Sequence, residues 1–181
     1  FEDHFKYKSE NLSKIKLYNA LQKRPRAHRA WLFSALVEAG LLDDGINSMN
    51  YLPQDHTWHW HRTMSDAQYK RIESLLPMLP PHTDSKESEL EAFSGGDSGK
   101  YQMEYNVQIG LDTWVTVISE AGFAEDTCFL SEKVYKPIAA CQPFIVFGNR
   151  GSLENLRKLG YKTFDPLIDE TYDQLPAWER L

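Results

Sequence analysis

TCFLSEKVYKPIAACQPFIVFGNRGSLENLRKLGYKTF, residues 127–164, is the stretch that decides the fold class of this chain. Residues 144–147 within it are apolar throughout, and so short a run is typical of a strand buried in a parallel sheet rather than of a helix. Residues 148–151 break the run with two glycines, and Ser152 then stands at the N-cap position of a predicted helix. The apolar face of that helix carries Leu153, Leu156 and Leu159, and Gly160 ends it. The stretch therefore predicts a strand, a turn and a helix.

A second helix is expected just upstream, with Ser131 as its N-cap. Glu132 and Lys133 then occupy its first turn, where backbone N–H groups without intrahelical partners point outward. Such a terminus attracts phosphate, although Glu and Lys in a first turn are also ordinary solvated residues. Pro137 favours a further alternative, in which Glu132 and Lys133 form a short turn before a helix that starts at the proline.

The first half of the chain predicts a β-α-β unit. Residues 14–21 alternate basic and apolar side chains, which is typical of a strand. Residues 26–39 carry apolar side chains at helical spacing and are followed by Gly40, and residues 46–49 predict a short second strand.

A further strand is expected over residues 113–118, which are rich in β-branched side chains, after a short helix within residues 101–111. The strand leads into Ser119 and Glu120, and ligands bind at the carboxyl ends of the strands in an open α/β sheet. These patterns together predict a single α/β domain over residues 1–181. We expect a Rossmann-like, three-layer arrangement with a mainly parallel sheet.

Composition excludes several classes of protein. Of the 181 residues 41% are hydrophobic and 25% are charged, and no apolar run approaches the roughly 18 residues that a membrane span requires. The net charge of −6 argues against general nucleic-acid binding. Residues 14–29 nevertheless hold six basic residues and no acidic one, which suits one small anionic ligand or is a solvated basic helix face. Cys128 and Cys141 form no C-x-x-C pair, so neither a disulfide framework nor a cysteine zinc site is expected, and a cytoplasmic location fits.

The middle of the chain predicts loops more than regular structure. His56, His59 and His61 lie among tryptophans without the spacing of a zinc motif, so an aromatic loop that packs on the domain or lines a sugar pocket is the preferred interpretation. Residues 65–76 predict a surface helix, and residues 80–100 predict a flexible linker. No D-x-D triplet occurs, so the usual divalent-metal clamp for a nucleoside diphosphate is missing and no metal site is expected.

Two blocks of the sequence resemble the donor-binding half of the α-1,3-fucosyltransferases and their bacterial and phage relatives. Residues 129–133, FLSEK, followed after eight residues by QPFI at 142–145, are similar to the donor-site motif of that family. Residues 26–32, RAHRAWL, followed by a helix and by LDDG at 42–45, are similar to its Arg-containing helix and to the strand entrance that comes next. The resemblance covers about residues 14–164.

The resemblance implies half of a GT-B glycosyltransferase that uses a nucleoside-diphosphate sugar without a metal ion. In that family an Arg and a Lys hold the donor pyrophosphate and a Glu accepts hydrogen bonds from the ribose. The matching positions here are Arg29, Lys133 and Glu132. Further candidates for the donor site are Arg26, Ser131 and Glu120.

We therefore expect a domain that binds a nucleotide-sugar donor as substrate, with no cofactor, and serves a glycan or other hydroxyl acceptor. The family's acceptor half supplies the catalytic base and is expected before Phe1, so no catalytic residue is assigned. Within the chain the candidate bases are Glu120, Asp126 and the cluster His56–His61, and no motif ties them to an acceptor. The alternative is a non-catalytic nucleotide- or sugar-binding domain on the same fold.

Overall fold

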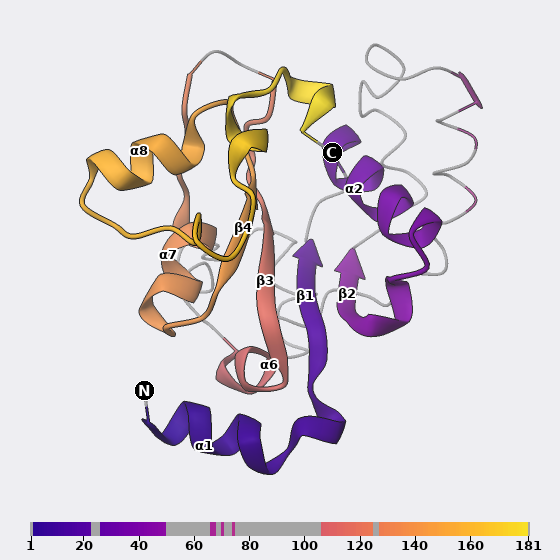
Figure 1. Ribbon diagram of the computed structural model, residues 1–181. Helices are drawn as coiled ribbons and strands as arrows, with labels where there is room; N and C mark the ends of the chain where they lie inside the picture. The colour runs from indigo at the N-terminus through magenta and orange to yellow at the C-terminus, as the bar shows by residue number, and fades with distance from the viewer. Residues whose placement is uncertain are drawn as a thin grey trace, which may run out of the picture.

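The computed structural model describes residues 2–22, 26–49, 66, 67, 70, 74, 106–124 and 127–180. Over these residues the centre of the protein is a four-stranded sheet in the order β2-β1-β3-β4, and every neighbouring pair is parallel (Figure 1). The strands are β1 Lys16–Gln22, β2 Gly45–Met49, β3 Thr113–Ser119 and β4 Phe144–Phe147. The helices are α1 Glu2–Glu10, α2 Ala27–Glu38, α6 Val107–Leu111, α7 Glu132–Ala139 and α8 Ser152–Lys158. The predicted parallel sheet is confirmed.

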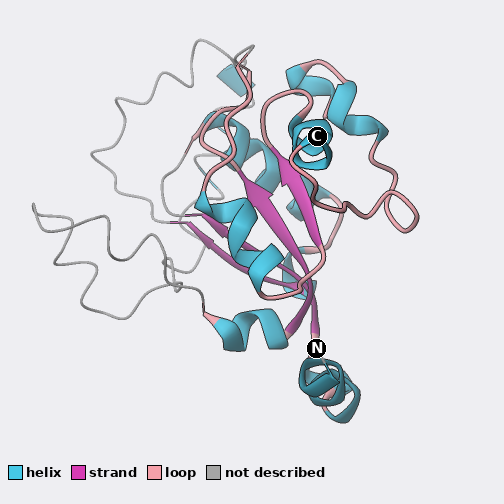
Figure 2. Ribbon diagram, turned by 90° about the vertical axis from the view of Figure 1, so that its left-hand side faces the viewer, coloured by secondary structure: helices cyan, strands magenta, loops and turns pink. Residues whose placement is uncertain are grey.

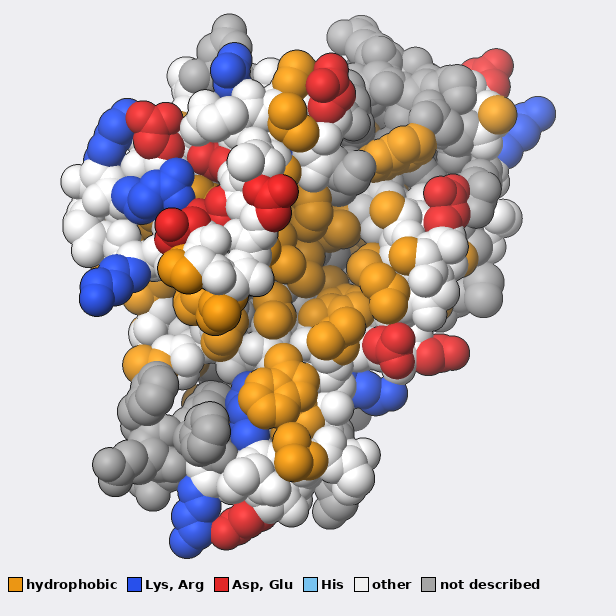
Figure 3. Space-filling view, in the orientation of Figure 1, with side chains coloured by type: hydrophobic (Ala, Val, Ile, Leu, Met, Phe, Trp, Pro, Cys, Tyr) orange, Lys and Arg blue, Asp and Glu red, His pale blue; other side chains and the backbone are white. Residues whose placement is uncertain are grey.

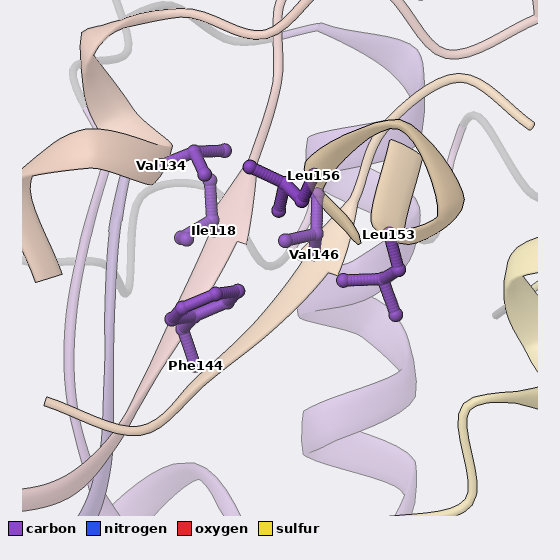
Figure 4. Close-up of a cluster of buried hydrophobic side chains, with 6 residues drawn as sticks. All are labelled: Ile118, Val134, Phe144, Val146, Leu153 and Leu156. Carbon is purple, nitrogen blue, oxygen red and sulfur yellow. The ribbon is translucent and has the colours of Figure 1, made fainter. Parts of the chain in front are cut away.

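Helices cover both faces of the sheet (Figures 1 and 2). Successive side chains of a strand point to opposite faces, and β3 shows this at two neighbouring residues. Ile118 belongs to a core that α7 and α8 cover, whereas Val117 belongs to a core that α2 covers. The first core, drawn in Figure 4, contains Ile118, Val134, Phe144, Val146, Leu153 and Leu156. The second contains Tyr18, Ala20, Leu32 and Val117. The fold is thus a three-layer, Rossmann-like α/β arrangement, as the sequence predicts.

The expected elements fall within one or two residues of the observed ones wherever the structure describes them. The short helix expected within residues 101–111 is α6, and the predicted helix 65–76 is helical at its described positions 66, 67, 70 and 74. The cluster His56–His61, the linker 80–100 and Asp126 lie outside the described residues.

Position 45, the first residue of β2, requires glycine because a tyrosine ring occupies the space where a side chain would lie. A Cβ at this position would lie 2.2 Å from Cζ of Tyr18. The ring is held in place, since its hydroxyl donates to the carbonyl of Leu41 at 3.1 Å and accepts from Nδ2 of Asn47 at 3.2 Å. The glycine of the LDDG segment therefore permits close packing of β1 against the entrance of β2.

The predicted N-cap of α7 is confirmed. Ser131 has an extended backbone, and its hydroxyl oxygen accepts from the backbone N–H of Lys133 at 3.3 Å. The helix continues through Pro137, so the alternative of a short turn before a helix starting at the proline is wrong. Pro137 is buried, and its backbone carbonyl accepts from the N–H of Gln142 at the end of the helix.

The predicted N-cap of α8 is wrong by one residue. Gly151 holds the N-cap position with a left-handed φ of 76°, which favours glycine, and Ser152 is the first helical residue. The cap is supplied from a distance by Asp173, whose carboxylate accepts from the backbone N–H groups of Leu153 at 3.0 Å and Glu154 at 3.2 Å. Ser152 fits the local N-cap pattern, but the carboxylate of Asp173 supplies the cap instead. This carboxylate binds two free N–H groups of the helix, whereas a serine hydroxyl would bind one.

Helix α1 lies at the amino-terminal ends of the strands, below the sheet in Figure 1. Lys8 is 5% exposed, and its ammonium donates to the carbonyl of Thr113 and, at 3.3 Å, to Oε1 of Gln142. Burial lowers the pKa of Lys8. Helix α1 is therefore fixed to the start of β3 and to the segment that leads into β4.

Replacing Asp173 by Ala is expected to lower the free energy of unfolding by about 2 kcal/mol, because two N–H groups of α8 lose their charged cap. Urea denaturation followed by circular dichroism measures this change. Asp165→Ala is the matched control: Asp165 is an exposed aspartate of the same tail, and its removal should change stability little. Equal effects of the two substitutions would contradict the capping role.

Candidate functional site

The candidate site lies at the carboxyl end of β3 and centres on the side chain of Glu120. This residue directly follows the strand, is 0% exposed, and its backbone N–H donates to the carbonyl of Phe147 at the end of β4. Oε1 accepts from the backbone N–H of Ser131 at 2.8 Å, and Oε2 accepts from the Ser131 hydroxyl at 2.6 Å. Both carboxylate oxygens are therefore engaged by the N-cap residue of α7, and the start of that helix is fixed to the end of β3.

The first turn of α2 is bound to the same strand end from the other face of the sheet. Nη1 of Arg26 donates to the carbonyl of Ala121 at 2.8 Å, and Nη2 of Arg29 donates to the carbonyl of Ser119 at 3.0 Å. Nε2 of His28 lies 2.9 Å from the carbonyl oxygen of Glu120. The N-cap residue and two first-turn residues of α2 thus contact three successive carbonyl groups at and just beyond the end of β3.

His28 also joins an aromatic contact that sequence reasoning missed. Its ring stacks on Phe123, with centroids 4.9 Å apart and an interplanar angle of 10°. The guanidinium carbon of Arg180 lies 4.8 Å from the centroid of the same Phe123 ring, and Arg180 donates to the carbonyl of Phe123 and, at 2.7 Å, to that of Leu175. The C-terminal tail is therefore tied to the loop that follows β3, a contact between residues too far apart in the chain for any local pattern to indicate.

Lys133 and Glu132 form the accessible part of the site. The Lys133 side chain is 34% exposed and that of Glu132 is 25% exposed, and Nζ of Lys133 lies 2.5 Å from Oε1 of Glu132. Nζ of Lys133 is also 3.3 Å from the Ser131 hydroxyl oxygen. Burial pushes the pKa of Glu132 upward, but the hydrogen bond and charge of Lys133, helped by Lys136, outweigh it, so this pKa lies below its ordinary value.

The structure brings the predicted site residues together around the end of β3, although in unequal positions. Arg29 is 4% exposed and faces backbone carbonyls, so its positive charge lies beneath the surface of the edge. Lys133 reaches the surface and connects to Glu120 through the hydroxyl of Ser131. Two helix N-termini that carry basic side chains therefore meet at one strand end from opposite faces, and such an arrangement can hold an anionic group.

Comparison with known protein families, with curated proteins and with solved structures finds no match to this chain. Within the described parts of the chain, no helix has the length and apolar character needed to span a membrane. Those same parts contain no group of three or more His, Cys, Asp or Glu side chains placed to hold a metal ion.

The bond between Glu120 and Ser131 is expected to show in a double-mutant cycle. Glu120→Gln and Ser131→Ala should each lower the free energy of unfolding by about 1–3 kcal/mol, because a buried group loses its partner. The double variant should lose less than the sum, with a coupling energy of about 1–2 kcal/mol. Ser131→Ala combined with Asp165→Ala serves as the control and should be additive. A Glu120 and Ser131 pair that is additive as well would show that the bond contributes no stability.

Glu132 is expected to contribute to acid sensitivity. Because its pKa is lower in the folded state than the ordinary value of 4.5, its carboxylate stabilises the fold above that pH, and this contribution is lost as the pH falls through the folded pKa. Melting temperatures of the wild type and Glu132→Gln, measured between pH 6 and pH 3, should differ most at the upper end and converge below about pH 4.5. A difference that stays constant over this range would contradict the assignment.

Proposed function

We propose that this chain is the donor-binding domain of a metal-independent glycosyltransferase, which holds a nucleoside-diphosphate sugar at the carboxyl edge of the sheet for transfer to a hydroxyl acceptor. The observation that carries the proposal is the meeting of the first turns of α2 and α7 at Glu120. The two helices come from opposite faces of the sheet, and both bring basic side chains to one strand end.

The strand order supports a ligand at this place. From β1 the chain crosses to β2 on one side, and from β3 it crosses to β4 on the other, so the direction of winding reverses between β1 and β3. Open α/β sheets bind their ligands at such a switch point, outside the carboxyl ends of the strands. The helices that follow β1 and β3 are α2 and α7, whose N-termini carry partial positive charge that suits a phosphate.

The proposed roles follow from exposure. Lys133 reaches the surface beside the start of α7 and is the cation that contacts the donor phosphates, while Glu132 accepts hydrogen bonds from the ribose. Arg26 is partly exposed and Arg29 is buried. They hold the end of β3 and the loop after it through backbone carbonyl groups, and they add positive potential at the pyrophosphate position. Fixed cations of this kind neutralise a leaving nucleoside diphosphate without a metal ion.

One observation favours a second candidate, a non-catalytic domain that binds the same ligand. Both oxygens of Glu120 accept hydrogen bonds from Ser131, so this carboxylate is committed to the structure and does not serve as a base. Transfer then requires a base from another part of the protein. A transfer assay with the full protein separates the two candidates, since nucleotide binding is expected of both.

Lys133→Ala is expected to weaken the binding of the donor nucleotide by about 1.5–3 kcal/mol, the range for a hydrogen bond to a charged group. Isothermal titration with GDP and with UDP measures the loss. Lys158→Ala is the control, because Lys158 is 66% exposed on α8 and pairs there with Glu154. Unchanged affinity in Lys133→Ala, with tight binding by the wild type, would remove Lys133 from the site.

The same titration in excess EDTA tests the absence of a metal requirement. Affinity should persist, because positive side chains rather than a divalent ion neutralise the phosphates. Loss of binding on chelation, followed by recovery on adding Mg²⁺ or Mn²⁺, would contradict this part of the proposal.

A further inference from the structure

The ladder pairing between β1 and β3 stops before the two strands end. Their pairing runs from Lys16 opposite Thr113 to Asn19 opposite Thr116 and then stops. In contrast, β2 stays paired with β1, and β4 with β3, as far as the last residues of those strands. The ladder is therefore open, without paired residues between the two strands, over residues 20–22 and 117–119, at the position where the winding direction reverses.

Two buried polar side chains stand at this opening, one on each strand. Gln22, the last residue of β1, is 5% exposed, and Ser119, the last residue of β3, is 2% exposed. Neither Nε2 of Gln22 nor Oγ of Ser119 has a hydrogen-bond partner among the residues that the structure describes. By alternation along the strands, Gln22 lies on the face of Tyr18 and Ala20, and Ser119 lies on the face of Val117, which is the face that α2 covers.

Buried polar groups in folded proteins are almost always hydrogen-bonded, and a group left without a partner destabilises the protein. A bound ligand would supply the missing partner for both atoms. Here two such groups flank the opening on neighbouring strands and on the same face. In Figure 3 the molecule is hollowed in the middle of the visible face, and hydrophobic side chains line the hollow. A ligand at the ends of β1 and β3 gains hydrogen bonds from both of these polar groups.

We infer that Gln22 and Ser119 bind a phosphate oxygen of the donor nucleotide in the opening between β1 and β3. The amide N–H of Gln22 and the hydroxyl of Ser119 are both hydrogen-bond donors, so an oxygen that accepts two hydrogen bonds completes them. An anionic oxygen is favoured because Nη2 of Arg29 lies 3.0 Å from the carbonyl oxygen of Ser119, which brings positive charge to the same strand end. The inference rests on the proposed function. It gives a role to Ser119, which the sequence placed at the carboxyl edge, and adds Gln22, which the sequence did not indicate.

Gln22→Met and Ser119→Ala replace each polar group by an apolar one of similar or smaller size. Each variant is expected to bind GDP, UDP and inorganic pyrophosphate about three- to tenfold more weakly, the loss of one hydrogen bond. The melting temperature of the free protein should stay the same or rise, because a buried polar group without a partner is removed. A purely structural role would not give this combination.

Thr116→Val is the matched control on the same strand. Thr116 is buried too, but its side chain lies on the other face and accepts from Nδ2 of Asn19 at 3.0 Å. This variant should melt at a lower temperature and keep its nucleotide affinity.

The outcomes separate the two proposals. If the wild type binds nucleotide and both variants bind equally well, the pair holds only a buried water, and the inference fails while the proposed function stands. If the variants lose affinity no more than Thr116→Val while losing thermal stability, the inference fails in the same way. If the wild type binds neither a nucleotide nor pyrophosphate, both proposals fall together.

Discussion

The arrangement of the carboxyl edge depends on one buried carboxylate. Glu120 has no exposed surface, and taking a carboxylate out of water is costly unless its oxygens are hydrogen-bonded. The backbone N–H and the hydroxyl of Ser131 meet this need. A shift of α7 along or away from β3 would break both bonds at once. The position of the helix start, and of Lys133 as its second residue, is therefore set by the hydrogen bonds of Glu120.

The same strand end is bound from the other face by a different kind of contact. The carbonyl groups of residues 119–121 lie at and just beyond the end of β3 and need donors. Arg29, His28 and Arg26, at the start of α2, lie within hydrogen-bonding distance of them. The two guanidinium groups are charged donors, and their hydrogen bonds are stronger than those of neutral donors would be. Arg26 and Arg29 thus have a structural role, because they bind backbone carbonyl groups. Their charge also creates a positive potential at the carboxyl edge of the sheet.

The C-terminal tail completes the framework at two points. Asp173 caps α8, and Arg180 contacts both the ring and the carbonyl of Phe123, in the loop that also carries the stacking partner of His28. Tyr172 covers the outer edge of the sheet, since its hydroxyl accepts from the backbone N–H of Val146. Residues that follow the last strand therefore determine how the loops around the candidate site are held.

Patterns within short windows determined the architecture. The apolar run 144–147, the β-branched run 113–118 and the helical spacing of 26–39 each require one kind of backbone to bury their apolar side chains, and these elements were predicted at their observed places. Ser131 was also predictable as an N-cap, because a cap depends on residues only two or three positions away. Ser152 fails the same rule because Asp173 supplies a charged cap from a distant part of the chain, which no local pattern reveals.

Only the tertiary structure decided that Glu120 accepts hydrogen bonds from Ser131 and that Arg26 and Arg29 bind backbone carbonyl groups. It also decided that the ladder between β1 and β3 stops before Gln22 and Ser119. Strand order and register arise from packing between segments distant in the sequence, and local propensity does not determine that packing.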